Sequence, residues 1–290
     1  MRPRSRRHAL VTTALAVVAV VALTVTATWT FTSSGSVTAA KAATANPTAS
    51  PQPATPTSSA TVLPGPTTLS PNGPVHLVGL GDSVMSGTNC DCDGITSELA
   101  DSLAKVWRVP VSQVNLGESG ATTDDLLDDL TNDSRTMSEV TNADVVVVII
   151  GANDLTDDLD TWRRTGCGRS CYQPHVQQMQ NRLAKILARI TNLEGNRPFS
   201  LVVDGYWNIL TDGQTALKQG GWPQLSWSRA VTASVDSAIR DAASTAGAHY
   251  VELRSVFSNT PDPLLADDGD HPNAAGVEAI AEANLRVLRG

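Results

Sequence analysis

Residues 145–150 read Val-Val-Val-Val-Ile-Ile and are followed directly by Gly-Ala-Asn-Asp at 151–154. Six consecutive aliphatic residues, all of them β-branched, indicate a β-strand. Because successive side chains point to opposite faces of a strand, a run without a polar residue predicts that both faces are buried. This pattern is typical of a central strand in a parallel sheet that helices cover on both sides.

Similar but shorter aliphatic runs lie on both sides of this strand. They predict further strands at 75–80, 111–116, 199–203 and 249–253. The stretches between them have helical periodicity and predict helices at 95–107, 123–130, 175–193, 224–246 and 273–288. Alternating strands and helices predict an α/β fold, a three-layer αβα sandwich around a five-stranded parallel sheet. In such sheets ligands bind at the carboxyl ends of the strands.

The N-terminal part of the chain has a different composition. Four arginines within residues 2–7 precede an apolar run at 10–27. A membrane span requires about 20 apolar residues, so residues 1–31 fit either a cleaved signal peptide or a single-pass membrane anchor. Both alternatives leave the arginines in the cytoplasm and predict an extracytoplasmic location for the rest of the chain.

Residues 32–74 consist mainly of Ala, Thr, Ser and Pro and contain half of the 16 prolines of the chain. With so few aliphatic side chains, this stretch is predicted to be a disordered linker. Residues 75–290 form the predicted folded domain. Their net charge is −13, against −8 for the whole chain, because five basic and no acidic residues precede them. An acidic domain without a basic stripe excludes nucleic acid as a partner.

Small polar segments follow the first three predicted strands. They are Gly-Asp-Ser-Val-Met-Ser-Gly at 81–87, Asn-Leu-Gly-Glu-Ser-Gly-Ala-Thr at 115–122 and Gly-Ala-Asn-Asp at 151–154. A fourth segment, Asp-Gly-Asp-His-Pro-Asn at 268–273, precedes the last predicted helix. Because the carboxyl ends of parallel strands meet at one edge of the sheet, these segments are expected to converge.

Together the four segments supply the groups that hydrolysis of an ester requires. Ser83 is the candidate nucleophile, His271 the base that takes its proton, and Asp268 the carboxylate that orients the imidazole. Asp267 and Asp270 are close rivals of Asp268 in the sequence. The candidate donors to the oxyanion are the backbone N–H groups of Ser83 and Gly117 and the side-chain amide of Asn153.

These segments, in this order, resemble the SGNH hydrolase superfamily, also called GDSL esterases and lipases. The positions that give the superfamily its name are occupied by Ser83, Gly117, Asn153 and His271, and its triad acid by Asp268. The resemblance covers residues 75–289. It implies a flavodoxin-like sheet with strand order 2-1-3-4-5 and ester hydrolysis without a metal or another cofactor. Val84 stands where the family pattern has Leu, which exchanges one apolar side chain for another.

The resulting interpretation is an extracytoplasmic serine esterase with its catalytic domain at 75–290, acting as a monomer. The expected substrate is a lipid, a small acyl ester or an acetylated glycan. A lipase or short-chain esterase is favoured slightly over a carbohydrate or cell-wall O-acetylesterase. Two alternatives from other classes are a catalytically silent glycan-binding module and a phosphate-binding flavodoxin-like protein. The complete set of Ser83, Asp268 and His271 favours the enzyme over both.

The four cysteines follow two of the polar segments. Cys90 and Cys92 come after the serine loop, and Cys167 and Cys171 come after the asparagine loop. An exported chain with an even cysteine count favours disulfides. Because the first and third strands are expected to be neighbours, two bridges between the loops are expected rather than a Cys90–Cys92 ring. A four-thiolate zinc site is the alternative, although the spacings are not those of the usual pairs.

Two further groups of residues have a structural and a functional interpretation. Aspartates cluster at 124–129 and at 154–160, but no EF-hand spacing accompanies them, so a solvated surface is favoured over a calcium site. Aromatic residues near the fourth strand are expected either in the core or on a wall of the substrate site. These aromatic residues are Tyr206, Trp207, Trp222 and Trp227.

Overall fold

The computed structural model describes residues 66–290, so the predicted export segment and most of the predicted linker lie outside the described residues. No helix within 66–290 combines the length and the apolar character needed to cross a membrane. The sheet contains β1 (Val75–Gly81), β2 (Val111–Gly117), β3 (Val145–Ile149), β4 (Ser200–Asp204) and β5 (His249–Val251). Its strands follow the order β2-β1-β3-β4-β5, and every neighbouring pair is parallel. The predicted fold and strand order are confirmed.

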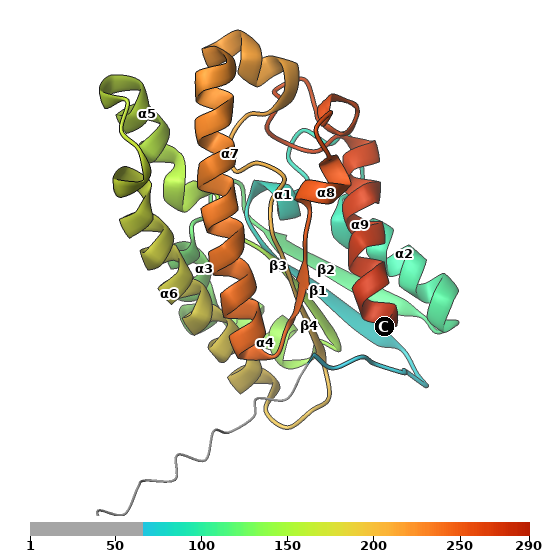
Figure 1. Ribbon diagram of the computed structural model, residues 1–290. Helices are drawn as coiled ribbons and strands as arrows, with labels where there is room; N and C mark the ends of the chain where they lie inside the picture. Colours follow the sequence, from blue (N-terminus) through green and yellow to red (C-terminus); the bar gives the residue numbers. More distant parts are fainter. Residues whose placement is uncertain (1–65) are drawn as a thin grey trace, which may run out of the picture. The chain divides into compact units, whose positions relative to one another are not determined.

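Helices cover both faces of the sheet (Figure 1). On one face, α6 (Arg169–Glu194) packs against α3 (Thr123–Asn132), α4 (Ser134–Thr141), α5 (Thr156–Thr165) and α7 (Gly213–Ala246). On the other face, α2 (Ile95–Trp107) packs against α9 (Ala274–Arg289). Short helical segments complete the domain: α1 (Ser83–Ser86), η1 (Asn153–Leu155), α8 (Arg254–Phe257) and η2 (Asp262–Leu264).

The central strand β3 is buried on both faces, as its uniform apolar sequence predicts. All five residues from Val145 to Ile149 are inaccessible to solvent. They contact the neighbouring strands β1 and β4 through the parallel ladders and the two helix layers through their side chains. This burial fixes the sheet between the helices and brings the segment that follows β3 to the edge where β1 and β2 also end.

The expected helices are present, with one informative difference. Helix α2 has the predicted bounds, whereas α7 begins at Gly213, eleven residues before the predicted start. Its backbone leaves helical geometry at Gly221, where φ is 65°, and Pro223 follows. A left-handed glycine followed by proline separates two helices, and the sequence pattern detects only the second of them.

The end of the predicted linker lies against the domain. The carbonyl oxygen of Thr67 accepts hydrogen bonds from Ser200 Oγ at 2.5 Å and from His249 Nε2 at 3.2 Å. Leu69 packs against the hydrophobic core. The ordered domain therefore begins before Pro74, where the composition placed its boundary, because these few residues find partners on β4 and β5.

The predicted pairing of the cysteines is wrong. The disulfides are local, Cys90–Cys92 and Cys167–Cys171, with Cα–Cα distances of 5.2 and 6.0 Å. Positive φ angles at Asn89 (59°) and at the residue between the first two cysteines fold that loop back on itself. Helix α5, about 15 Å long, separates Cys167 from the end of β3. The expected bridges require the cysteines to stay beside their strands, which α5 prevents.

Candidate active site

The segments after β1, β2 and β3 meet at one edge of the sheet. The strand register places Gly81 beside Gly117 and Ile149, so the three strands end at the same level. Ser83 follows the first strand and Asn153 the third. The described structure thus brings together three of the four polar segments through the sheet itself.

Ser83 begins helix α1 at a tight turn after β1. Gly81 has a φ of 149°, and a Cβ there would collide with the carbonyl oxygen of Ile149, so the turn requires glycine. Asp82 is the N-cap, and its carboxylate accepts the N–H of Val84 at 3.0 Å. The N–H of Ser83 lies in the first turn of the helix, and no acceptor for it is found within residues 66–290. It is available to a ligand.

Asp82 is held from a second side by a buried tyrosine. Tyr206 donates its hydroxyl proton to the Asp82 carboxylate and accepts the N–H of Ala152 at 3.4 Å. Burial raises the pKa of Asp82 to about 6, against the hydrogen bonds from Tyr206 and Val84 and the charge of His271, which lower it. Tyr206 therefore ties the serine loop to the asparagine loop.

His271 and Asp268 form a hydrogen-bonded pair just before α9. His271 Nδ1 lies 2.7 Å from Asp268 Oδ2. Partial burial works to raise the pKa of Asp268, but hydrogen bonds from the backbone of His271 and Asp270 and from the side chains of His271 and Asn89 outweigh it and lower the pKa to about 2. Asp268 is therefore ionised at neutral pH, as an orienting carboxylate must be.

The rival carboxylates are placed differently. Neither the Asp267 nor the Asp270 carboxylate accepts a hydrogen bond from the His271 side chain in the described structure. Burial also raises the pKa of Asp270. No hydrogen bond joins Ser83 Oγ to His271 within 66–290. In enzymes without substrate, hydrogen bonds between catalytic groups are often long and shorten when substrate binds. The candidate base and its carboxylate are thus hydrogen-bonded to each other, and the candidate nucleophile lies on the neighbouring loop.

Gly117 is not available as an oxyanion donor. Its N–H donates to Asn115 Oδ1 at 2.9 Å, and a Cβ at this position would lie 2.7 Å from the backbone of Met85. Gly117 is needed for the close approach of β2 to α1. The expectation based on the order of the segments therefore selects the wrong glycine of the loop.

Gly120 takes its place as the candidate donor. It is exposed in the same loop with a φ of 85°, and no described residue accepts its N–H. Asn153 Nδ2 donates to the carbonyl oxygen of the adjacent Ala121 at 2.9 Å, which leaves its second N–H free for a ligand. The sequence contains both glycines, but only the hydrogen bonds of the fold distinguish them.

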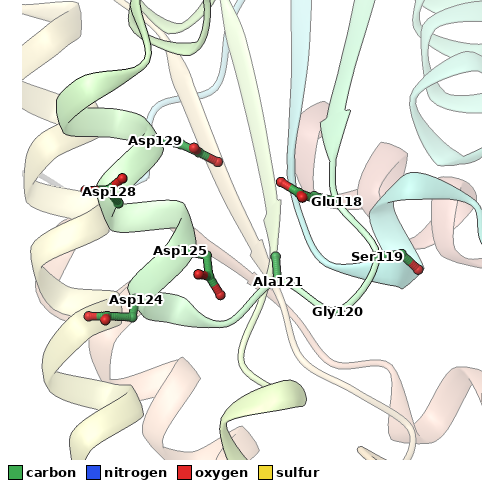
Figure 2. A pocket seen from close by; sticks show the side chains of 8 residues that line it. All are labelled: Glu118, Ser119, Gly120, Ala121, Asp124, Asp125, Asp128 and Asp129. Carbon is green, nitrogen blue, oxygen red and sulfur yellow. The ribbon is translucent and has the colours of Figure 1, made fainter.

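A cavity of about 470 Å³ adjoins Gly120 (Figure 2). Its wall carries five carboxylates, Glu118, Asp124, Asp125, Asp128 and Asp129. Burial and the neighbouring charges of Glu118, Asp133 and Asp128 raise the pKa of Asp129. Ala121 is the one apolar side chain in this wall, so a long acyl chain finds little apolar surface there.

The aromatic residues near β4 belong mainly to the core. Tyr206 and Trp207 are buried, and Trp207 stacks on Phe257 with ring centroids 4.1 Å apart. Trp227 is also buried and stacks on Trp162 at 5.4 Å. Trp222 is exposed. The core interpretation accounts for three of the four residues.

Within 66–290 no group of three or more His, Cys, Asp or Glu residues is arranged to hold a metal ion.

The sheet, the serine turn after β1 and the His271–Asp268 pair have the arrangement of an α/β/α hydrolase. The family of GDSL-like lipases and acylhydrolases matches residues 80–279, and the chain belongs to this family. The expected superfamily membership is confirmed, and the chain is a carboxylic ester hydrolase.

Solved structures with the same fold include a lipase from goat rumen metagenome, with a TM-score of 0.61 and 19% identity over 74% of this chain and 97% of that one. An acetylxylan esterase from Geobacillus stearothermophilus has a TM-score of 0.54 and 18% identity over 76% and 96% of the two chains. A lipase/acylhydrolase from Enterococcus faecalis has a TM-score of 0.52 and 17% identity over 74% and 96%. Comparison with curated protein sequences finds no match. At these identities the likeness shows the fold alone.

Proposed function

We propose that this hydrolase cleaves short-chain esters of a polar alcohol through an acyl-enzyme on Ser83. The observation that carries the reaction is the hydrogen bond between His271 Nδ1 and Asp268, which leaves His271 Nε2 to take the proton of Ser83. The Ser83 oxygen attacks the ester carbon. The negative oxygen of the tetrahedral intermediate accepts hydrogen bonds from the N–H groups of Ser83 and Gly120 and from the amide of Asn153.

The intermediate collapses when the bond to the alcohol breaks and His271 returns its proton to the leaving oxygen. Water then attacks the acyl group on Ser83 with His271 again acting as the base, which releases the acid and restores the serine. Every proton in this cycle passes through one imidazole. The ionised Asp268 stabilises the imidazolium that forms twice in each turnover.

The acidic cavity supports a short acyl group and a polar alcohol. Burial of a long alkyl chain yields about 0.8 kcal/mol per methylene only where apolar surface receives it, and this wall is almost entirely polar. An acetylated glycan is the second candidate, because one structure of the same fold is an acetylxylan esterase and the cavity is suited to hydroxyl groups. Both candidates share an acetyl-sized acyl group.

A substrate panel with Ser83→Ala tests the reaction and the acyl preference together. We expect the enzyme to hydrolyse p-nitrophenyl acetate faster than the palmitate ester and to release acetate from acetylated xylan. Ser83→Ala should lose roughly a thousandfold or more in kcat, because the nucleophile has no substitute. The measurement is initial rate at saturating substrate, with the unfolding temperature of each protein recorded alongside.

The matched control is Ser138→Ala, at an exposed serine on α4, which should retain full activity. Activity of Ser83→Ala equal to that of the wild type would show that Ser83 is not the nucleophile. Faster hydrolysis of palmitate would select a lipase instead. An enzyme that cleaves no ester at all would contradict the proposal and favour the silent glycan-binding module.

We also propose that the protein works outside the cytoplasm. Support comes from the arginines and apolar run at the N-terminus and from the pairing of all four cysteines in disulfides, which persist in oxidising compartments. Leu15→Arg in the apolar run should retain the protein in the cytoplasm, whereas Leu63→Arg in the linker should leave export unchanged. Fractionation of cells carrying each full-length variant measures this. Equal distribution of both variants would contradict the export role.

A further inference from the structure

The loop between α1 and α2 has an unusual backbone. Within residues 87–94, four residues have positive φ: Gly87 at 77°, Asn89 at 59°, Asp91 at 51° and Gly94 at 83°. The Cys90–Cys92 disulfide closes the loop at its centre. Left-handed geometry at non-glycine residues costs conformational energy, although Asn and Asp tolerate it best. The loop is therefore held in one specific shape.

That shape presents Asn89 to the carboxylate of Asp268. Asn89 Nδ2 lies 2.5 Å from Asp268 Oδ2, the same oxygen that receives His271 Nδ1 at 2.7 Å. The other oxygen, Oδ1, accepts the backbone N–H groups of Asp270 at 2.9 Å and His271 at 3.0 Å. Of the four donors, Asn89 alone comes from outside the turn at 268–271, and it is 179 residues away in sequence.

This contact joins the loop of the nucleophile to the loop of the base. Ser83 and Asn89 lie on the same connection between β1 and α2, six residues apart. Without the amide, Oδ2 would keep one donor and would face a cavity of about 570 Å³ that Asp91 and Asp267 also line. Neutral Asn89 holds the carboxylate without neutralising its charge, which a lysine or arginine in its place would do.

We propose that Asn89 is a positioning residue for ester hydrolysis. It fixes the carboxylate of Asp268, and through it the imidazole of His271, relative to Ser83, and the Cys90–Cys92 ring holds Asn89 in place. The inference rests on the proposed acyl transfer through Ser83. Hydrogen bonds to ionised groups are about twice as strong as neutral ones, so this single amide can restrict the orientation of the base.

Asn89→Gly removes the amide while retaining a residue that accepts positive φ. We expect kcat for p-nitrophenyl acetate to fall about tenfold, equivalent to about 1.4 kcal/mol, with KM unchanged within about twofold, because Asn89 acts on the base and not on the ground-state ester. Asp91→Gly is the matched control. It also places glycine at a positive-φ position of this loop, and Asp91 has no hydrogen bond with Asp268 within residues 66–290.

A double-mutant cycle with Asp268→Ala separates positioning from a structural role. If Asn89 acts through Asp268, Asn89→Gly should cause no further loss once that carboxylate is absent. An equal loss in both backgrounds, or equal losses in Asn89→Gly and Asp91→Gly, would overturn the inference. The wild-type and Ser83→Ala rates distinguish the two failures: an inactive wild type contradicts the proposed function, whereas an active wild type with a fully active Asn89→Gly contradicts only the positioning role.

Discussion

At the scale of single residues, a buried acid–amide pair joins the sheet to helix α9. Asn284 Nδ2 donates to Asp204 Oδ2 at 2.7 Å, and burial raises the pKa of Asp204 to about 8, while the bond from Asn284 lowers it. Asp204 Oδ1 and Asn284 Oδ1 are both buried and have no hydrogen-bond partner among the described residues. Protonation of Asp204 removes a buried charge and turns one of these acceptors into a donor.

The raised pKa predicts how this pair changes stability with pH. The unfolded carboxyl ionises near pH 4 and the folded one near pH 8, so the folded state binds the proton more tightly between these values. The contribution of Asp204 is therefore complete below pH 4 and is lost as pH rises towards 8. Asp204→Asn keeps a hydrogen-bond donor at every pH. Its free energy of unfolding relative to wild type should therefore rise by roughly 1 kcal/mol per pH unit in this window.

Urea unfolding at pH 5, 7 and 9 measures the free energies of unfolding for this comparison. Asp241→Asn, at an exposed aspartate of α7, is the control and should track wild type at each pH. A constant difference between Asp204→Asn and wild type across the series would show that Asp204 is already ionised in the folded protein.

The same scale shows which site residues the sequence can identify. Ser83, His271 and Asn153 are recognisable because each stands in a short polar segment beside a predicted strand or helix. The sequence does not decide between Gly117 and Gly120, since both are glycines at the end of the second strand, three residues apart. The choice depends on which N–H the Asn115 side chain occupies, and that is a property of the folded loop.

At the scale of elements, the two disulfides illustrate how an unpredicted helix changes a local prediction. Helix α5 is short and polar, with an apolar face limited to a few side chains, so its sequence reads as a loop. As a helix it moves Cys167 away from the sheet edge, and each cysteine pair then closes within its own segment. Periodicity detects long amphipathic helices and misses short ones such as α4 and α5.

The two disulfides are predicted to differ in their effect on catalysis. Cys90→Ser with Cys92→Ser frees the loop that holds Asn89, so kcat should fall several-fold, towards the roughly tenfold loss of Asn89→Gly. Cys167→Ser with Cys171→Ser is the matched control, since that disulfide lies at the start of α6 and carries no residue of the site. Hydrolysis of p-nitrophenyl acetate measures both. Equal activity in the two double variants would show that the Cys90–Cys92 disulfide does not hold Asn89 in position.

At the scale of the whole molecule, part of the negative charge of residues 75–290 is concentrated beside the candidate site. Five carboxylates gather in the cavity beside Gly120, at the edge where the strands end (Figure 2). Like charges so close together favour neutral over anionic ligands. The net charge of the sequence argues against nucleic acid as a partner, and the fold adds that five of the negative charges gather beside the candidate oxyanion donor Gly120.

The sequence by itself determined the α/β class and, through the family resemblance, the strand order and the candidates for nucleophile, base and carboxylate. These features follow from local composition: an unbroken aliphatic strand, amphipathic helices, and polar segments at strand ends. Tertiary structure alone decided the free glycine N–H, the cysteine pairing and the contact of Asn89 with Asp268. Each of these depends on which groups lie within hydrogen-bonding or bonding distance after residues far apart in the chain, or separated by a helix, have packed.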